Sequence, residues 1–371
     1  MDLNFTVEQK MIRSAARDFL LQNCTKEFVR SIEEDETGHS LELWQKMADL
    51  GWLGVPFPEK YAGTECSFLD FVVLLEEMGR FLLPTPFFST VILGGLTVLE
   101  AGSEEQKQEI LPKIINGQLN LTLALIEPVP RYSITSISTL AVFRGDNYEI
   151  SGTKLFVPDF HIARYFVCVA RTEEGDSLFL IDAKSPGINY TPLLTIAGDK
   201  QFEVTLDKVH VPINNLLGQP GQGSGVIKRV LQKAVVAKCA EMSGMAQQVL
   251  EMAVKYAKER KQFGCPIGSF QAIQHHCANM AIDVDTSRYL TYMAAWMVDK
   301  GLPCSKEVSA AKAWVSGACQ RVMALGHQIH GGIGATMDHD MQLYSRRAKA
   351  AELALGDANF HRELVAQEIG L

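Results

Sequence analysis

Apolar residues in the first third of the chain recur every three or four positions, which is the period of a helix with one buried face. This spacing runs through residues 11–20 and again through residues 68–78. Thr6 and Gln9 have the spacing of a capping box, a motif that marks the start of a helix. The pattern predicts a helical domain over residues 1–117.

The period changes in the middle of the chain. Residues 148–157 and 202–209 alternate between apolar and polar positions, and residues 165–170 form a short apolar run rich in aromatic and β-branched side chains. Turn signals such as Gly-Asp-Asn at 145–147 separate these runs. We therefore predict an antiparallel β domain over residues 118–222.

The helical period returns after a glycine-rich stretch at 218–225 and continues to the end of the chain. Breaks near 264–266, 301–303 and 331–334 divide it into helices. The glycine-rich stretch lacks the strand and the Lys-Ser/Thr of a phosphate-binding P-loop, so no P-loop is predicted. Residues 223–371 read as a four-helix bundle, and the fold class is α+β in the order helix, sheet, helix.

Composition and charge narrow the classes of function. The 371 residues are 47% hydrophobic and 21% charged, as in ordinary globular proteins. A net charge of −8 offers no broad basic field for nucleic acid, and no stretch approaches the ~20 apolar residues that cross a bilayer. Eight scattered cysteines without a C-x-x-C pair predict reduced thiols used in packing. These features, with no signal-like start, predict a cytoplasmic protein without a membrane span or nucleic-acid partner.

Two segments near the predicted helix ends carry candidate chemistry. Arg260 and Phe263 lie at a glycine corner, where a guanidinium can meet phosphate and a ring can meet a planar cofactor. Gln328 precedes Gly331 and Gly332, and glycines let a ligand approach the backbone closely. From the residues alone, a helix cap with a tight turn explains either segment as well.

Other polar and aromatic features have simpler structural interpretations. The histidine pairs at 275–276 and 327–330 lack a carboxylate or cysteine in ligand spacing, so no metal site is predicted. Glu76 and Glu77 are adjacent acids, which favours a solvated helix face. Trp314 lies in an apolar helical stripe and is predicted to be in the core.

Together and in this order, the segments resemble the acyl-CoA dehydrogenase family over essentially the whole chain. The matching stretches include the start of the sheet at 124–128, the strand at 150–154, the connection at 209–218 and the run Arg-Arg-Ala-Lys at 346–349. The resemblance implies a helical, a β and a four-helix-bundle domain. It also implies FAD, an acyl-CoA substrate, α,β-dehydrogenation with hydride transfer to the flavin, and an electron-transfer flavoprotein or similar acceptor.

The resemblance further implies a dimer of dimers, in which the Arg-x-x-Phe-Gly corner and the Gln-x-x-Gly-Gly loop of one subunit reach the FAD of its neighbour. The matching positions are Arg260, Phe263, Gln271, Gln328, Gly331 and Gly332. Flavin-contact positions of the β domain fall at Ile126 and Val157, within Ile-Glu-Pro and Phe-Val-Pro, where the family has Thr-Glu-Pro and Trp-Ile-Thr. The elements that reach a neighbour are intact, whereas hydroxyl donors for the chain's own flavin are replaced by apolar residues.

Neither family position for the catalytic base holds an acid. These positions are Leu355 and Ala234, and Val235 stands where the family places a substrate arginine. Arg131 and Tyr132 replace a small Gly-Ser pair, which indicates a reshaped acyl-CoA channel, and the acyl group itself stays undefined. No catalytic residue is therefore assigned. Three acids near the right segments remain as weak candidates for the base, namely Glu241, Glu352 and Asp357.

Two functional hypotheses follow from this asymmetry. In one, the chain is an FAD-dependent acyl-CoA dehydrogenase, alone or as a catalytic subunit, that recruits another acid. In the other, it is a non-catalytic subunit that completes the FAD site of a paralogous dehydrogenase subunit. A homo-tetramer or a hetero-tetramer with a paralogue is compatible with the sequence.

Overall fold

The computed structural model describes residues 5–128 and 137–371, so Arg131 and Tyr132 lie outside the described residues. The chain forms two compact units. The helical unit comprises residues up to Arg30, Ser67–Leu83 and Gln232–Leu371, and the sheet unit comprises Ser31–Cys66 and Pro84–Leu231. Neither unit is continuous in sequence, so the predicted boundaries at 117 and 222 stay predictions. The mixed helix and sheet class is confirmed.

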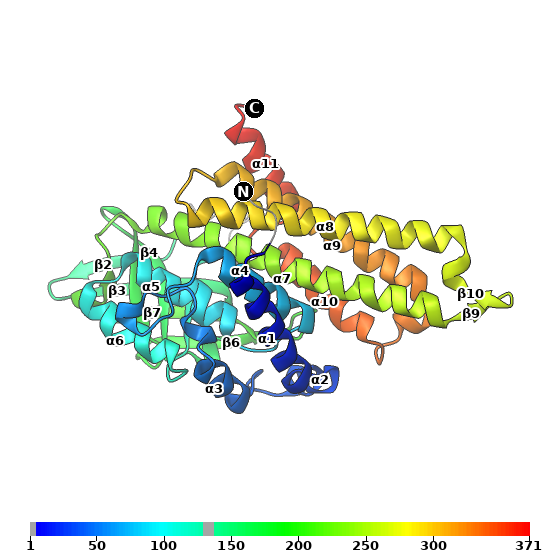
Figure 1. Ribbon diagram of the computed structural model, residues 1–371. Coiled ribbons are helices and arrows are strands. Elements are labelled where there is room, and N and C mark those ends of the chain that lie inside the picture. The colour runs from blue at the N-terminus through cyan, green and yellow to red at the C-terminus, as the bar shows by residue number, and fades with distance from the viewer. Residues whose placement is uncertain (1–4, 129–136) are drawn as a thin grey trace. The chain divides into compact units, whose positions relative to one another are not determined.

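Long helices dominate the helical unit, and α7, α8 and α9 extend beside one another (Figure 1). Its helices are α1 (Val7–Asn23), α4 (Phe68–Phe81), most of α7 (Gly223–Glu259), α8 (Gln271–Asp299), α9 (Ser305–His330), α10 (Asp340–Leu353) and α11 (Ala358–Glu368), and α2 (Lys26–Glu34) begins in it. The predicted capping box is confirmed, because the Thr6 hydroxyl accepts from the Gln9 amide and the Gln9 side chain accepts from the Thr6 amide. Helix α9 contacts α8, α10 and α11, which places it at the centre of the bundle.

Helices α4 and α7 cross in backbone contact. A Cβ on Gly79 would lie 2.1 Å from the carbonyl oxygen of Glu241, and one on Gly244 would lie 1.9 Å from the carbonyl oxygen of Glu76. Both distances are far below van der Waals contact, so only glycine permits the crossing. The crossing ties the N-terminal helices to the C-terminal bundle.

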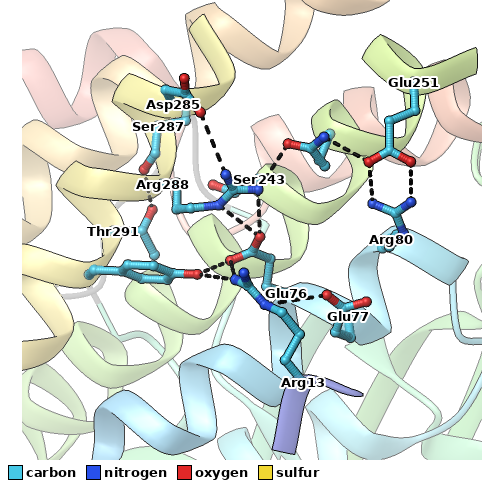
Figure 2. A network of polar contacts seen from close by, with 12 residues as sticks. Arg13, Glu76, Glu77, Arg80, Ser243, Glu251, Asp285, Ser287, Arg288 and Thr291 are labelled. Carbon is cyan, nitrogen blue, oxygen red and sulfur yellow. Dashed lines mark hydrogen bonds and ion pairs between the residues drawn. The ribbon is translucent and has the colours of Figure 1, made fainter. Parts of the chain in front are cut away.

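The prediction that Glu76 and Glu77 form a solvated face is wrong. Their side chains are 4% and 1% exposed, and α4 is buried around nearly its whole circumference. The Glu76 carboxylate accepts from Arg13 and Arg288, as Figure 2 shows, and it also accepts from the Tyr292 hydroxyl. These partners lie on α1 and α8, which explains why a local charge pattern failed: a buried acid is recognised by its tertiary partners.

The sheet unit contains one mixed sheet and several short helices. Its strands are β1 (Leu121–Ala124), β2 (Leu140–Arg144), β3 (Asn147–Pro158), β4 (Tyr165–Thr172), β5 (Gly175–Asp182), β6 (Ile188–Leu193), β7 (Gln201–Pro212) and β8 (Leu216–Leu217). Its main helices are α3 (Leu41–Asp49), the π-helix η3 (Phe88–Gly95), α5 (Leu96–Ala101) and α6 (Glu104–Ile115). The strand order is β6-β7-β3-β2-β4-β5-β8, with β1 added beside β4.

The prediction of a wholly antiparallel sheet needs correction. Strand β1 pairs parallel with β4, and β2 also meets β4 in parallel, whereas the remaining pairs are antiparallel. The β2–β3 hairpin lies between β1 and β4 in sequence, so the chain returns to the sheet in the direction in which it left. Alternating apolar residues reveal strands, but pairing direction depends on such non-local connections.

Three absences hold for the described ranges. No helix there combines the length and apolar character needed to cross a membrane. Within the same ranges, no three His, Cys, Asp or Glu side chains group as metal ligands. All eight cysteines are described and none forms a disulfide, and five of them are buried.

Candidate functional site

The corner after α7 is a tight hairpin with a strained aromatic residue. Strand β9 (Lys261–Gln262) pairs antiparallel with β10 (Cys265–Pro266), and the two residues between them, Phe263 and Gly264, have φ of +55° and +83°. Two left-handed residues form the type I′ turn that suits a two-residue hairpin. Glycine adopts this conformation freely, but phenylalanine pays about 1–2 kcal/mol. Phe263 is nevertheless 93% exposed, and the edge contact of its ring with Phe270, at a centroid distance of 6.0 Å, leaves it open to solvent, so packing within the chain explains little of this conformation.

The predicted glycine loop follows α9 and is open. Gly331 ends the helix with φ of +64°, and a Cβ added at Gly331 or Gly332 would meet nothing within 4 Å. Gln328 is exposed in the preceding turn, and Ile333 and Met337 are 51% and 65% exposed just beyond. The loop thus combines accessible backbone with exposed apolar side chains, which is a surface suited to a ligand or a partner.

A pair of stacked rings joins the corner to the loop. Tyr256, in the last turn of α7, stacks on His330 at a centroid distance of 4.7 Å, and the Arg260 amide donates to the Tyr256 carbonyl at 2.8 Å. Burial lowers the pKa of His330, which favours its neutral ring. The six predicted residues therefore gather at one end of the helical unit, with Gln271 exposed at the start of α8 beside the corner (Figure 1).

This end of the helical unit is also cationic. Lys255, Lys258, Arg260 and Lys261 are exposed within seven residues, and Glu259 is the single acid among them. Such a cluster attracts an anionic ligand. Guanidinium, glycine amides and an exposed ring are together the donor set that a phosphate-bearing planar cofactor requires.

The flavin-contact positions of the sheet unit also lie together. The Leu155 amide donates to the Ile126 carbonyl at 2.8 Å, which sets Ile126 beside β3. Strand β3 carries a bulge between Lys154 and Val157, and Phe156 there has φ of +52° and is 53% exposed. A bulge with a strained, exposed aromatic residue is a common feature of functional sites.

The donors at this bulge do not match what a flavin ring needs. The Val157 side chain is fully buried in the sheet core, so it is not presented to a ligand. Ile126 has no polar side-chain atom, and Pro158 has neither a hydroxyl nor an amide hydrogen. The Thr122 hydroxyl, which is close by, already donates to the Pro158 carbonyl at 2.7 Å. The residues present therefore fit the phosphate-binding half of an FAD site better than the ring-binding half.

The first base position lies in a turn that is held from two sides. Leu355 has φ of +62° between α10 and α11, and its carbonyl meets the buried His361 ring nitrogen at 3.0 Å. The buried Lys312 ammonium donates to the carbonyls of Ala351 at 2.7 Å and Glu352 at 2.9 Å. Burial lowers the pKa of Lys312 to about 8 and that of His361 to about 4. The chain keeps a strained, fixed turn at this position although leucine cannot accept a proton.

The other candidate positions are taken up by structural contacts. Ala234 is fully buried in α7, so the second base position faces the core. Glu241 and Glu352 each form an ion pair one helical turn away, and Asp357 caps α11. Their partners are Lys238 at 2.5 Å, Lys349 at 2.7 Å and the Phe360 amide at 2.8 Å.

Lys312, His361 and the Tyr256–His330 stack did not emerge from the sequence pattern. Lys312 follows apolar residues in a helical stripe, where a lysine is ordinarily exposed. Its role is apparent only from the structure, in which the end of α10 lies beside the Lys312 ammonium. The sequence offers one indirect signal. A lysine within an apolar stripe that is buried must find hydrogen-bond acceptors inside the protein.

Comparisons with known proteins agree with this geometry. The family models match in chain order: acyl-CoA dehydrogenase N-terminal domain at residues 6–118, middle domain at 122–209 and C-terminal domain at 221–370. The chain therefore belongs to the acyl-CoA dehydrogenase family, a family of flavoprotein oxidoreductases that act on acyl-CoA thioesters.

Individual relatives span the full chain. It is 32% identical to a probable acyl-CoA dehydrogenase, YngJ, of Bacillus subtilis over 100% of both chains. It is 31% identical to the CarC subunit of the caffeyl-CoA reductase-Etf complex of Acetobacterium woodii, over 98% of each. A chain in the ChsE4-ChsE5 complex from Mycobacterium tuberculosis is 29% identical, with a TM-score of 0.92 over 100% of this chain and 99% of that one.

Proposed function

We propose that this chain is a subunit of a hetero-oligomeric acyl-CoA dehydrogenase and completes the FAD site of a paralogous subunit that carries the catalytic glutamate. The observation that most directly supports this proposal is the exposed Phe263, whose backbone is strained and which lies beside an open glycine loop. The same chain has leucine at the position of the catalytic base. A costly conformation that gains little packing within the chain, one edge contact with Phe270, is explained by a partner's ligand. The assembly is a tetramer, and the compartment is the cytoplasm, which the free thiols support.

The residues at the end of the helical unit have separate roles in this proposal. When bound, FAD would supply the hydride-accepting chemistry of the dehydrogenation. Arg260 would hold phosphate oxygens through its guanidinium hydrogens, and the amides of Gly331 and Gly332 would add neutral donors. Phe263 would cover an aromatic face and exclude water, while Gln328 would supply an amide group. Leu355 presents an apolar side chain and moves no proton.

The relatives support a partner without fixing its identity. ChsE4 and ChsE5 form a complex, and CarC is a subunit of a complex that includes an Etf component. By analogy, electrons from the proposed assembly pass to an electron-transfer flavoprotein or a similar acceptor.

Flavin absorbance of the purified chain, alone and co-expressed with a paralogue, tests the proposal. We expect the isolated chain to hold little FAD and the complex to hold it stably. A yellow, active homo-tetramer with one FAD per chain would refute the proposal and favour a complete site. In that event, replacing Glu241, Glu352 and Asp357 singly by Ala or Asn would identify the base.

Arg260→Ala is expected to weaken FAD binding by the complex about 10- to 100-fold, because a hydrogen bond to a charged group contributes about 1.5–3 kcal/mol. The dissociation constant is measured by flavin fluorescence titration of the assembled complex. Arg362→Ala, an exposed arginine on α11, is the matched control and should leave the constant unchanged. An unaltered constant in Arg260→Ala would exclude the corner from the partner's site.

Leu355→Glu is expected to leave the turnover of the complex unchanged, because the paralogue supplies the base. The fixed turn accommodates the change, since the contacts at residues 351, 352 and 355 involve carbonyl groups. Turnover is measured with an artificial electron acceptor, and Leu353→Glu, on the exposed end of α10, serves as control. A large gain specific to Leu355→Glu would show that this chain holds its own flavin and substrate.

A further inference from the structure

Three aromatic rings form a continuous stack at the base of the glycine loop. Tyr256, near the end of α7, stacks on His330, the last residue of α9, at a centroid distance of 4.7 Å and an interplanar angle of 29°. His330 in turn meets the His339 ring in a T-shaped arrangement at a centroid distance of 4.9 Å. His339 immediately precedes α10. This aromatic stack therefore connects the end of α7 to the residues on both sides of the loop.

Backbone hydrogen bonds fix the orientation of both histidine rings. The Nδ1–H group of His330 donates to the Gly326 carbonyl at 2.7 Å, and the residue is 6% exposed. The Nδ1 atom of His339 accepts from the Met341 amide at 3.2 Å and so caps α10. A ring protonated at Nδ1 could not accept this bond, so the cap favours neutral His339. The stack is thus an ordered, uncharged surface beside the cationic corner.

The glycine loop is closed against the stack on one side and open on the other. A Cβ on Gly334 would lie 3.0 Å from the His330 Cβ, and the Gln342 side chain donates to the Gly334 carbonyl at 3.1 Å. A Cβ on Gly332 would meet nothing within 4 Å among the described residues. The closed side holds the shape of the loop, and the open side leaves the Gly332 backbone accessible to a ligand.

We propose that the aromatic stack is a positioning element that sets the spacing between Arg260 and the Gly332 backbone, so that both hold phosphate oxygens of one bound FAD. The inference rests on the proposed function, in which the corner and the loop serve a partner's flavin. Tyr256 lies one helical turn before Arg260, whose amide donates to the Tyr256 carbonyl at 2.8 Å. His330 lies two residues before Gly332. Donors whose separation is fixed in advance bind a ligand more tightly, because they need not be ordered on binding.

A double-mutant cycle on FAD affinity tests the inference in the complex co-expressed with the paralogue. We expect His330→Ala to weaken FAD binding about 5- to 10-fold, a coupling of the order found between residues that act as a unit. In the Arg260→Ala background the same change should have an effect below about 2-fold, since no guanidinium is left to position. His330→Phe keeps a ring in the stack and should restore the dissociation constant of the parent chain.

The outcomes separate this inference from the proposed function. Unchanged FAD affinity in Arg260→Ala would overturn both. A loss in Arg260→Ala without a loss in His330→Ala would overturn this inference alone. Equal losses from His330→Ala with and without Arg260 would do the same, because the stack would then only stabilise the bundle. Tyr256→Leu breaks the same stack from α7 and replaces His330→Ala if circular dichroism shows that variant to be unfolded.

Hydrogen exchange of the isolated full-length chain, without FAD, gives a second readout. His330→Ala should speed exchange of the amides at 332–336 by about 2- to 10-fold, as expected for the loss of an aromatic pair, and leave α4 unchanged.

Trp314→Ala on the same helix is the control for this measurement. Trp314 lies sixteen residues before His330, about 24 Å along α9 at 1.5 Å per residue. It is 40% exposed and the Arg321 guanidinium lies 5.4 Å from its ring, so the prediction that it lies in the core is wrong. Trp314→Ala should leave exchange in the loop unchanged. Equal acceleration in both variants, or none in His330→Ala, would show that the stack does not order the loop and would overturn the inference.

Discussion

Glu76→Ala is expected to lower the free energy of unfolding of the helical unit by about 3–5 kcal/mol, because it removes the buried carboxylate that two partly buried guanidinium groups share. Glu76 accepts from Arg13 at 3.3 Å, from Arg288 at 2.9 Å and from the Tyr292 hydroxyl. Removing the carboxylate leaves two guanidinium groups, 24% and 20% exposed, and a buried phenol with fewer acceptors. The penalty is their desolvation rather than the lost attraction alone.

Asp18→Ala is the matched control for this prediction. Asp18 is an exposed acid on α1 in the same unit, so its removal should leave the free energy of unfolding nearly unchanged. Urea titration followed by hydrogen exchange measures the loss of unfolding free energy in α4 and α8, the helices that contain the network. Equal effects of the two substitutions would mean that water reaches Glu76 and that the network contributes little.

The same network shows where prediction from sequence ends. The capping box at Thr6 is local in sequence, so the helix that it begins could be predicted. Glu76 could not be placed, because Arg288 and Tyr292 lie more than 200 residues away in the chain. The prediction of strand direction in the sheet was wrong for the same reason, because β1 and β4 pair in parallel and the β2–β3 hairpin lies between them in the chain.

The same distinction between features that are local in sequence and contacts that are not applies to the candidate site. The corner at Phe263 and Gly264 could be predicted because Arg260, the aromatic residue and the glycine turn follow one another closely in the sequence. The exposure of the Phe263 side chain was not predicted. This exposure makes the hairpin a candidate binding surface. Leu355 was identified by motif spacing, whereas the two groups that fix its turn, Lys312 and His361, come from neighbouring helices. Short motifs therefore indicate which residues matter, and packing determines what they contact.

Glu127→Gln is expected to destabilise the sheet unit by about 3 kcal/mol at neutral pH and to remove much of its sensitivity to acid. Burial alone would raise the pKa of Glu127, but hydrogen bonds from Lys154, Ser138 and Thr139 and the Lys154 charge lower it from 4.5 to about 2. A shift of this size corresponds to about 3 kcal/mol by linkage. Lys154, fully buried, also donates to the Val169 carbonyl at 2.6 Å, so the pair connects β3 and β4.

The sign of the pH dependence follows from the direction of the shift. Because the pKa of Glu127 is lower in the folded state, its contribution is complete above about pH 4.5 and is lost as the pH falls towards 2. Unfolding midpoints of the parent chain between pH 7 and pH 3, read from hydrogen exchange in β3 and β4, should fall more steeply than those of Glu127→Gln. Asp207→Asn, an exposed acid on β7, should keep the parent slope. Parallel slopes for all three proteins would show that Glu127 titrates alike in the folded and unfolded chain, and that the buried ion pair does not cause the acid sensitivity.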